Sequence, residues 1–168
     1  MARVLRVIDC VSEYSGRMIS VVCAFLILIL CYEVVARYVF SNPTAWASDI
    51  SKMMGATIAS MGLAYTLLHN GHVRIDVLYG RLSKRGQAAL DVIMNILLMF
   101  PLMGALTYAA GSWMVRSWVE GERWFWSIWY PPLGPVRTMV FLGLVLFTLQ
   151  VLAVFVRDVY LLVRGGEP

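Results

Sequence analysis

Four apolar segments, each about 20 residues long, constrain the fold of this chain most strongly. They cover residues 18–38, 50–68, 88–111 and 133–156. A helix crosses the roughly 30 Å hydrocarbon layer in about 20 residues, because each residue advances it by about 1.5 Å. Backbone polar groups find no water inside lipid, so each spanning segment must be helical. We therefore predict an all-α integral membrane protein with four spans, forming a single transmembrane domain over residues 1–168.

The composition agrees with a membrane setting and argues against nucleic-acid binding. Hydrophobic residues make up 60% of the chain and charged residues 14%, whereas an ordinary soluble domain has about 25% charged residues. The net charge is +4, but the basic residues form no patch with aromatic side chains that could stack on bases. We therefore expect no nucleic-acid partner.

The first apolar segment has a second interpretation, as the core of a cleaved signal peptide. Such a core is about 7–15 residues long and precedes a small-residue cleavage site. Here the apolar stretch is longer and ends in Glu33, Arg37 and Tyr38. We therefore interpret it as an uncleaved first span.

The distribution of Lys and Arg predicts the orientation, because short cytoplasmic connections are enriched in these residues. If four spans alternate, the two termini and the connection between the second and third spans lie on one side. Nine of the 14 Lys and Arg residues belong to that side and five to the other. We therefore predict that both termini and this connection are cytoplasmic.

The tryptophans also favour this orientation. All six lie on the predicted outer side, namely Trp46, Trp113, Trp118, Trp124, Trp126 and Trp129. Tryptophan prefers the headgroup layer, where its ring is half apolar and its N–H stays hydrated. We expect the segment 112–130 to lie along the outer, periplasmic interface, and the connection between the second and third spans to lie along the cytoplasmic one.

Two sets of polar residues lie in or near the predicted spans. Glu33 and Arg37 are four residues apart and can pair on one helix; the alternative is that Glu33 binds a proton or cation. Gln87, Asp91 and Asn95 form a polar stripe on the third segment, and such a stripe should face other helices or a partner subunit. A proton relay at Asp91 is the alternative, but it needs ionisable neighbours on other helices, and packing is favoured because Asp91 is the only acid in the membrane half of its helix.

The second segment carries small residues at a spacing of four. Gly55 pairs in this way with Ala59, and Ala56 with Ser60 and Ala64. Small faces let helices approach closely in lipid, so this segment is predicted to associate with other helices.

The sequence offers no enzyme or cofactor site. Nucleotide-binding glycine loops, zinc-protease helices and nucleophile elbows are absent. Haem ligation in a membrane anchor needs imidazoles inside the bilayer on facing helices, whereas His69 and His72 lie together at the end of one span. We expect no catalytic residues, no cofactor and no metal.

Three stretches in a fixed order around the predicted spans resemble one known family. Residues 33–40 read Glu-Val-Val-Ala-Arg-Tyr-Val-Phe, and Trp46 and Asp49 follow. Residues 71–77 read Gly-His-Val-Arg-Ile-Asp-Val, and residues 131–134 read Pro-Pro-Leu-Gly. Together they resemble the small membrane subunit of tripartite ATP-independent periplasmic (TRAP) transporters.

The resemblance implies a supporting role in a secondary solute importer. In that family a large membrane subunit carries the substrate and sodium sites, and a soluble periplasmic receptor delivers the solute. The small subunit pairs with the large one and fixes it in the bacterial or archaeal inner membrane. The implied partners are therefore the large subunit, the receptor and membrane lipid.

The resemblance and the polar positions together nominate residues for subunit contact or folding. They are Glu33, Arg37, Trp46, Asp49, Gly71, His72, Arg74, Asp76, Asp91 and Asn95. Gly71 is expected to permit a tight turn after the second span. Two other functions stay open: a self-sufficient oligomeric transporter or channel that uses Glu33 or Asp91, and a membrane anchor for a redox enzyme with haem at His72.

Overall fold

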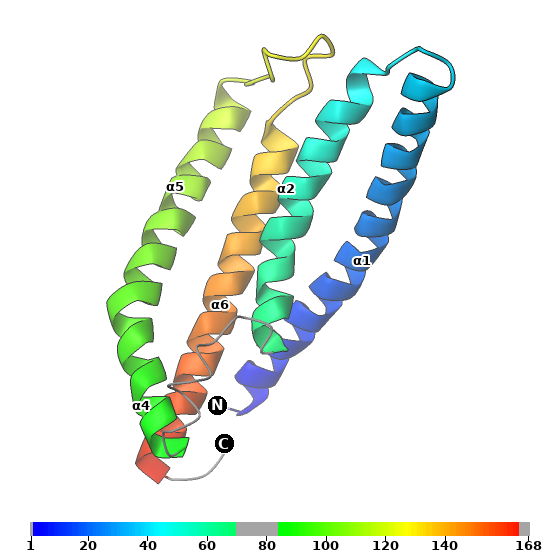
Figure 1. The fold of residues 1–168 in the computed structure, drawn as a ribbon. Coiled ribbons are helices and arrows are strands. Elements are labelled where there is room, and N and C mark those ends of the chain that lie inside the picture. The colour runs from blue at the N-terminus through cyan, green and yellow to red at the C-terminus, as the bar shows by residue number, and fades with distance from the viewer. Residues whose placement is uncertain (1, 70–83, 165–168) are drawn as a thin grey trace.

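The computed structural model describes residues 2–69 and 84–164, and the regular elements in these ranges are all helices. They are α1 (Ala2–Tyr38), α2 (Ala45–Leu68), α4 (Lys84–Met94), η1 (Asn95–Met99), α5 (Phe100–Val119) and α6 (Gly134–Arg164). Because α4, η1 and α5 follow one another without a break, they form one rod. The described chain thus contains four helical rods that lie side by side (Figure 1). The all-α prediction is confirmed.

Three of the four rods are long and apolar enough to cross a membrane. These stretches are Leu5–Tyr38, Ala89–Val119 and Gly134–Val163. α2 falls short on composition because Asp49, Lys52 and several hydroxyl side chains interrupt its apolar residues. The four predicted helices are therefore present, and the crossing of the membrane by α2 stays a prediction.

The helices extend beyond the predicted spans, because the polar residues that flank the apolar segments continue the helix. α1 begins at Ala2 rather than near residue 18. Within this polar extension Glu13 and Arg17 form an i,i+4 ion pair at 3.2 Å on the helix surface. The third rod continues to Val119, so only part of the predicted interfacial segment 112–130 lies in a loop.

The third rod contains a π-helical turn just before Pro101. Proline has no N–H, so the carbonyl four residues before it loses its helical partner. The turn η1 lies directly before Pro101, and the Phe100 N–H donates to the Asn95 carbonyl, five residues back. The rod changes direction between α4 and α5 (Figure 1).

The packing centre of the bundle is α6, which contacts α1, α2, α4 and α5. Its Phe147 and Val151 join Ala64 of α2 and Met103 of α5 in the buried apolar cluster. Helices α2 and α6 approach so closely at Gly143 that a β-carbon there would lie 2.6 Å from the Ser60 carbonyl carbon. Small residues permit this backbone contact.

The predicted small-residue faces of α2 are partly confirmed. Ser60 and Ala64 are buried, in agreement with helix association. Ala56 and Ala59 are exposed, and a β-carbon at Gly55 would have no neighbour within 4 Å. Only one of the two small faces therefore packs inside the described bundle.

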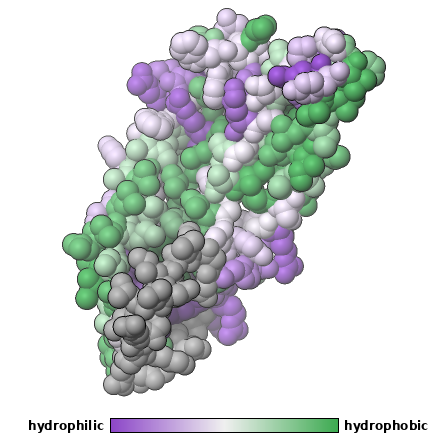
Figure 2. Space-filling model, viewed as in Figure 1, coloured by the Kyte–Doolittle hydropathy of each residue, from purple (hydrophilic) through white to green (hydrophobic). Residues whose placement is uncertain are grey.

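The surface combines an apolar middle with polar ends. On the face shown in Figure 2 hydrophobic residues cover much of the middle of the molecule, and hydrophilic residues gather near both ends. The exposed apolar side chains include Phe25 and Leu28 of α1 and Leu97 and Leu102 of the third rod. A soluble protein rarely leaves so broad an apolar surface exposed, whereas lipid or a membrane partner covers it without cost.

A substitution at the α2–α6 contact tests this packing. Gly143→Ala is expected to lower the free energy of unfolding by about 1–3 kcal/mol, because the added methyl group forces two backbones apart. Gly55→Ala is the control, since its methyl group meets nothing within 4 Å. Thermal unfolding in detergent measures both variants, and equal stability of the two would contradict the close contact.

Candidate functional site

The described candidate residues gather mainly at one end of the bundle, where Glu33 joins α1 to the start of α2. Its carboxylate is buried, and Arg37 donates to it at 2.6 Å. The Thr44 N–H donates to its second oxygen at 3.1 Å, and the Thr44 hydroxyl donates to the same oxygen. Thr44 is the N-cap residue of α2 but makes no side-chain cap bond. Its hydroxyl therefore bonds to Glu33 of α1 instead of capping α2.

The backbone between α1 and α2 is shaped to bring Thr44 back to Glu33. Ser41 has φ of 51°, in the left-handed region that non-glycine residues seldom occupy. The Asn42 N–H donates to the Ala36 carbonyl at 3.0 Å, which closes the end of α1. The chain thus reverses within a few residues. The predicted Glu33–Arg37 pair becomes part of a corner in which Glu33 accepts hydrogen bonds from two Arg37 nitrogens, Nε and Nη2, and from the N–H and hydroxyl of Thr44.

A second buried acid, Asp49, holds the loop that precedes α6. The Ser127 hydroxyl donates to the Asp49 carboxylate, and the Trp129 N–H donates to the Ser127 oxygen at 3.0 Å. Asp49 and Ser127 are both buried. This bond links two segments that lie 78 residues apart in sequence, so it fixes the 120–133 loop against α2.

Aromatic contacts reinforce this end of the bundle. The rings of Trp46 and Tyr32 stack with their centroids 5.9 Å apart, which ties α2 to α1. The Lys52 ammonium lies 5.8 Å from the centre of the Trp124 ring, within the range of a cation–π contact. Trp46 and Asp49 therefore both lie at junctions, Trp46 between α2 and α1 and Asp49 between α2 and the 120–133 loop.

A polar clasp at the opposite end joins α1 to α6. Gln150 and Ser12 are fully buried, and the Ser12 hydroxyl donates to the Gln150 side-chain oxygen at 2.8 Å. The Gln150 amide donates to Asp9 at 3.0 Å, and Arg157 forms an ion pair with the same carboxylate. We did not predict this clasp. In the sequence, the clasp was indicated only by Gln150, a single amide side chain in an apolar segment. Such an amide requires a polar partner, but the sequence does not identify that partner.

The other predicted residues are dispersed. Asp91 and Asn95 lie on α4 and η1 and are partly buried, and Asn95 begins the π-helical turn. Gly71, His72, Arg74 and Asp76 lie outside the described residues. In the part of the chain that the structure describes, no group of three His, Cys, Asp or Glu side chains could hold a metal ion.

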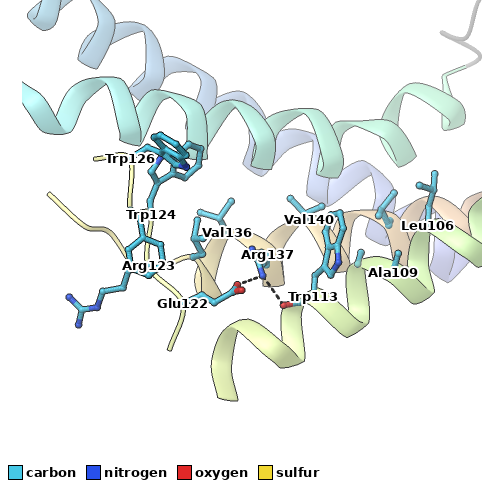
Figure 3. Close-up of a pocket in the computed structure, with 14 residues that line it drawn as sticks. Leu106, Ala109, Trp113, Glu122, Arg123, Trp124, Trp126, Val136, Arg137 and Val140 are labelled. Atoms are coloured by element: carbon cyan, nitrogen blue, oxygen red, sulfur yellow. Dashed lines mark hydrogen bonds and ion pairs between the residues drawn. The ribbon is translucent and has the colours of Figure 1, made fainter. Parts of the chain in front are cut away.

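An apolar cleft lies between α5, α6 and the loop that connects them, residues 120–133 (Figure 3). Its volume is about 640 Å³, and its walls include Leu106, Trp113, Trp126 and Val140. At its loop end Arg137 forms an ion pair with Glu122 and donates to the Trp113 carbonyl at 3.2 Å. The predicted tryptophan-rich segment therefore forms one wall of a cleft, which the sequence pattern did not indicate.

These features define a class: a small membrane protein with several apolar helices, internally paired polar groups and no recognisable catalytic centre among its described residues. The sequence matches the family described as "Tripartite ATP-independent periplasmic transporters, DctQ component" over residues 26–160. The chain belongs to this DctQ family, which supplies the small, non-catalytic membrane subunit of TRAP transporters. No curated protein and no solved structure matches the chain. The resemblance inferred from the sequence motifs is confirmed.

Removing the central amide tests the α1–α6 clasp. Gln150→Leu is expected to lower the free energy of unfolding by about 1–3 kcal/mol, because Ser12 and Asp9 each lose a buried hydrogen bond. Adding Ser12→Ala should recover part of this loss, since the unpaired hydroxyl is then gone. Detergent-induced unfolding measures each variant.

The exposed Ser20 provides the control for this prediction. Its hydroxyl bonds only to the Arg17 carbonyl within α1, so Ser20→Ala should leave stability nearly unchanged. A Gln150→Leu variant as stable as Ser20→Ala would contradict the clasp.

Proposed function

We propose that this chain, as one transmembrane domain, pairs with the large membrane subunit of its transporter and anchors that subunit in the bilayer. Its membership of the DctQ family supports a role as one component of a three-part complex. One observation carries the proposal. The buried acidic side chains are bonded within the chain, whereas broad apolar helix faces are uncovered.

The bonded acids argue against transport by this chain alone. A coupling carboxylate must bind and release its ion during each cycle. Glu33 already accepts bonds from Arg37 and Thr44, and Asp49 accepts one from Ser127. Asp91 likewise has an interaction partner. We infer that the nominated polar residues act through folding and assembly, and that substrate and ion sites belong to the large subunit.

The exposed face of α1 is the surface we propose for the large subunit. Its exposed apolar residues alternate at spacings of three and four: Val7, Val11, Tyr14, Met18, Val21, Phe25, Leu28, Tyr32 and Val35. An average spacing of 3.5 residues suits a long helix that packs alongside with a left-handed twist. The stripe begins before residue 18, among Arg3, Arg6 and Glu13, where lipid tails do not explain exposed apolar side chains. A partner helix does explain them.

The orientation we propose has both ends of the chain in the cytoplasm and the 120–133 loop in the periplasm. The distribution of Lys and Arg supports it, and so does the position of both connections, α1–α2 and α5–α6, at the same end of the bundle (Figure 1). The side chains of Phe125, Trp126 and Ile128 are 77%, 96% and 87% exposed. We propose that this loop helps to receive the periplasmic solute receptor.

Co-purification tests the subunit role. We expect a C-terminally tagged chain, extracted from native membranes in a mild detergent, to bring down a stoichiometric large membrane protein identified by mass spectrometry. Val11→Ser combined with Tyr14→Ser should reduce that recovery severalfold, because it interrupts the α1 stripe. Cys10→Ser is the control, since Cys10 is exposed beside the stripe but is not part of it.

The alternative of a self-sufficient transporter gives opposite results. It predicts recovery of this chain alone, transport by the chain in liposomes, and loss of that transport in Glu33→Gln with assembly unchanged. The scaffold role predicts no transport by the chain alone. It also predicts that any effect of Glu33→Gln on the complete transporter follows the amount of assembled complex.

Reporter fusions test the orientation. Green fluorescent protein joined to the C-terminus should fluoresce, and alkaline phosphatase at the same position should be inactive, because the first folds in the cytoplasm and the second in the periplasm. Alkaline phosphatase joined after Gly121, in the outer loop, should be active. The reverse pattern would contradict the proposed topology.

A further inference from the structure

The cleft between α5, α6 and the 120–133 loop has the shape of a binding site for a single apolar chain. Its volume of about 640 Å³ lies within the range of about 300–1,000 Å³ that is typical of small-molecule sites. Along α5 it runs from Leu106 to Trp113, which is roughly 10 Å of helix. Val136, Val140 and Leu144 line it on α6. Beyond its mouth the cleft is therefore lined almost entirely by apolar side chains.

The mouth of the cleft is positively charged. The nearby carboxylates are already engaged: Glu122 pairs with Arg137, and Glu120 pairs with Arg116 at 2.9 Å. Within the described residues no carboxylate forms an ion pair with Arg123, and Figure 3 shows its side chain extending from the loop away from the cleft. The mouth therefore carries one guanidinium that is free to meet an anion.

A second cation lies close to the same wall. The Lys52 ammonium is 5.8 Å from the centre of the Trp124 ring, and Trp124 lines the cleft. Tryptophan side chains favour the headgroup layer of a bilayer. Three of them border this cleft: Trp113, Trp124 and Trp126. The mouth thus has the positive charge and the tryptophan side chains that are typical of proteins at the lipid headgroup layer. The apolar interior of the cleft extends from the mouth toward the bilayer centre.

We propose that this cleft binds one anionic phospholipid, with an acyl chain between α5 and α6 and the phosphate group at Arg123. A ligand of this site must be apolar over the length of the cleft and anionic at its mouth. A phospholipid has both properties in one molecule. An apolar helix of another protein would fill the cleft but leave the guanidinium without a counter-charge.

Quenching of tryptophan fluorescence tests the site, because three tryptophans line it. The full-length protein is reconstituted in phosphatidylcholine vesicles that contain increasing fractions of phosphatidylglycerol with brominated acyl chains. We expect a quenching phase that saturates at a low fraction of the brominated lipid. Arg123→Gln should raise the fraction needed by about fivefold, because one basic residue near an anionic lipid contributes about 1 kcal/mol. Arg6→Gln, an exposed arginine on α1, is the control and should leave the fraction unchanged.

A cleft-filling variant and a second measurement complete the test. Ala109→Phe places a ring in the cleft and should remove the saturating phase. Native mass spectrometry, which compares phosphatidylglycerol retained by the wild type and by Arg123→Gln, answers the question even if Ala109→Phe fails to fold. The proposal is wrong if quenching rises linearly in the wild type or if Arg123→Gln and Arg6→Gln behave alike. It is also wrong if the saturating phase disappears in the co-purified complex, since a helix of the large subunit would then occupy the cleft.

Discussion

The cost of leaving a polar side chain unpaired in an apolar environment determines how this chain is arranged. At each end of the bundle, buried polar side chains avoid this cost by hydrogen bonding to one another or to the backbone. At the loop end, Glu33 and Asp49 are buried and accept bonds from Arg37, Thr44 and Ser127. At the other end, Gln150 is bonded within the α1–α6 clasp. Between these ends, apolar and small side chains make the helix contacts, so the polar bonds set the register of helices that apolar packing alone would leave free to slide.

The position of α2 follows from this arrangement. It is the rod without a stretch apolar enough to count as a membrane span, and it lies against both α1 and α6. Its Asp49 binds the 120–133 loop, and its small Ser60 lets the backbone of α6 approach at Gly143. The two outer rods, α1 and the rod that contains α5, keep exposed apolar faces. The chain therefore packs α2 between α1 and α6 and leaves the apolar faces of its two outer rods available to lipid or to another membrane subunit.

The sequence predicted the number and type of helices because the apolar segments and the membrane thickness leave few choices. It also predicted the Glu33–Arg37 pair, since a spacing of four fixes that contact within one helix. It did not predict the bonds from Thr44 to Glu33, from Ser127 to Asp49 or within the Gln150 clasp. Those depend on which helices lie together, and residue spacing carries no such information. The cleft was missed for the same reason, because it exists only once α5, α6 and their loop are assembled.

The two surfaces proposed for partners are compatible because they belong to different helices. The α1 stripe lies on one outer rod, and the cleft lies between α6 and the other outer rod, α5. A large subunit that packs along α1 would therefore leave the cleft open to lipid. Arg123 and Glu33 then have distinct tasks, although both lie near the loop end of the bundle. Glu33 holds two helices of the chain together, whereas Arg123 offers its charge to a molecule outside the chain. If this subunit anchors a larger protein in the bilayer, as we propose, a bound lipid would extend the anchored surface beyond its own helices.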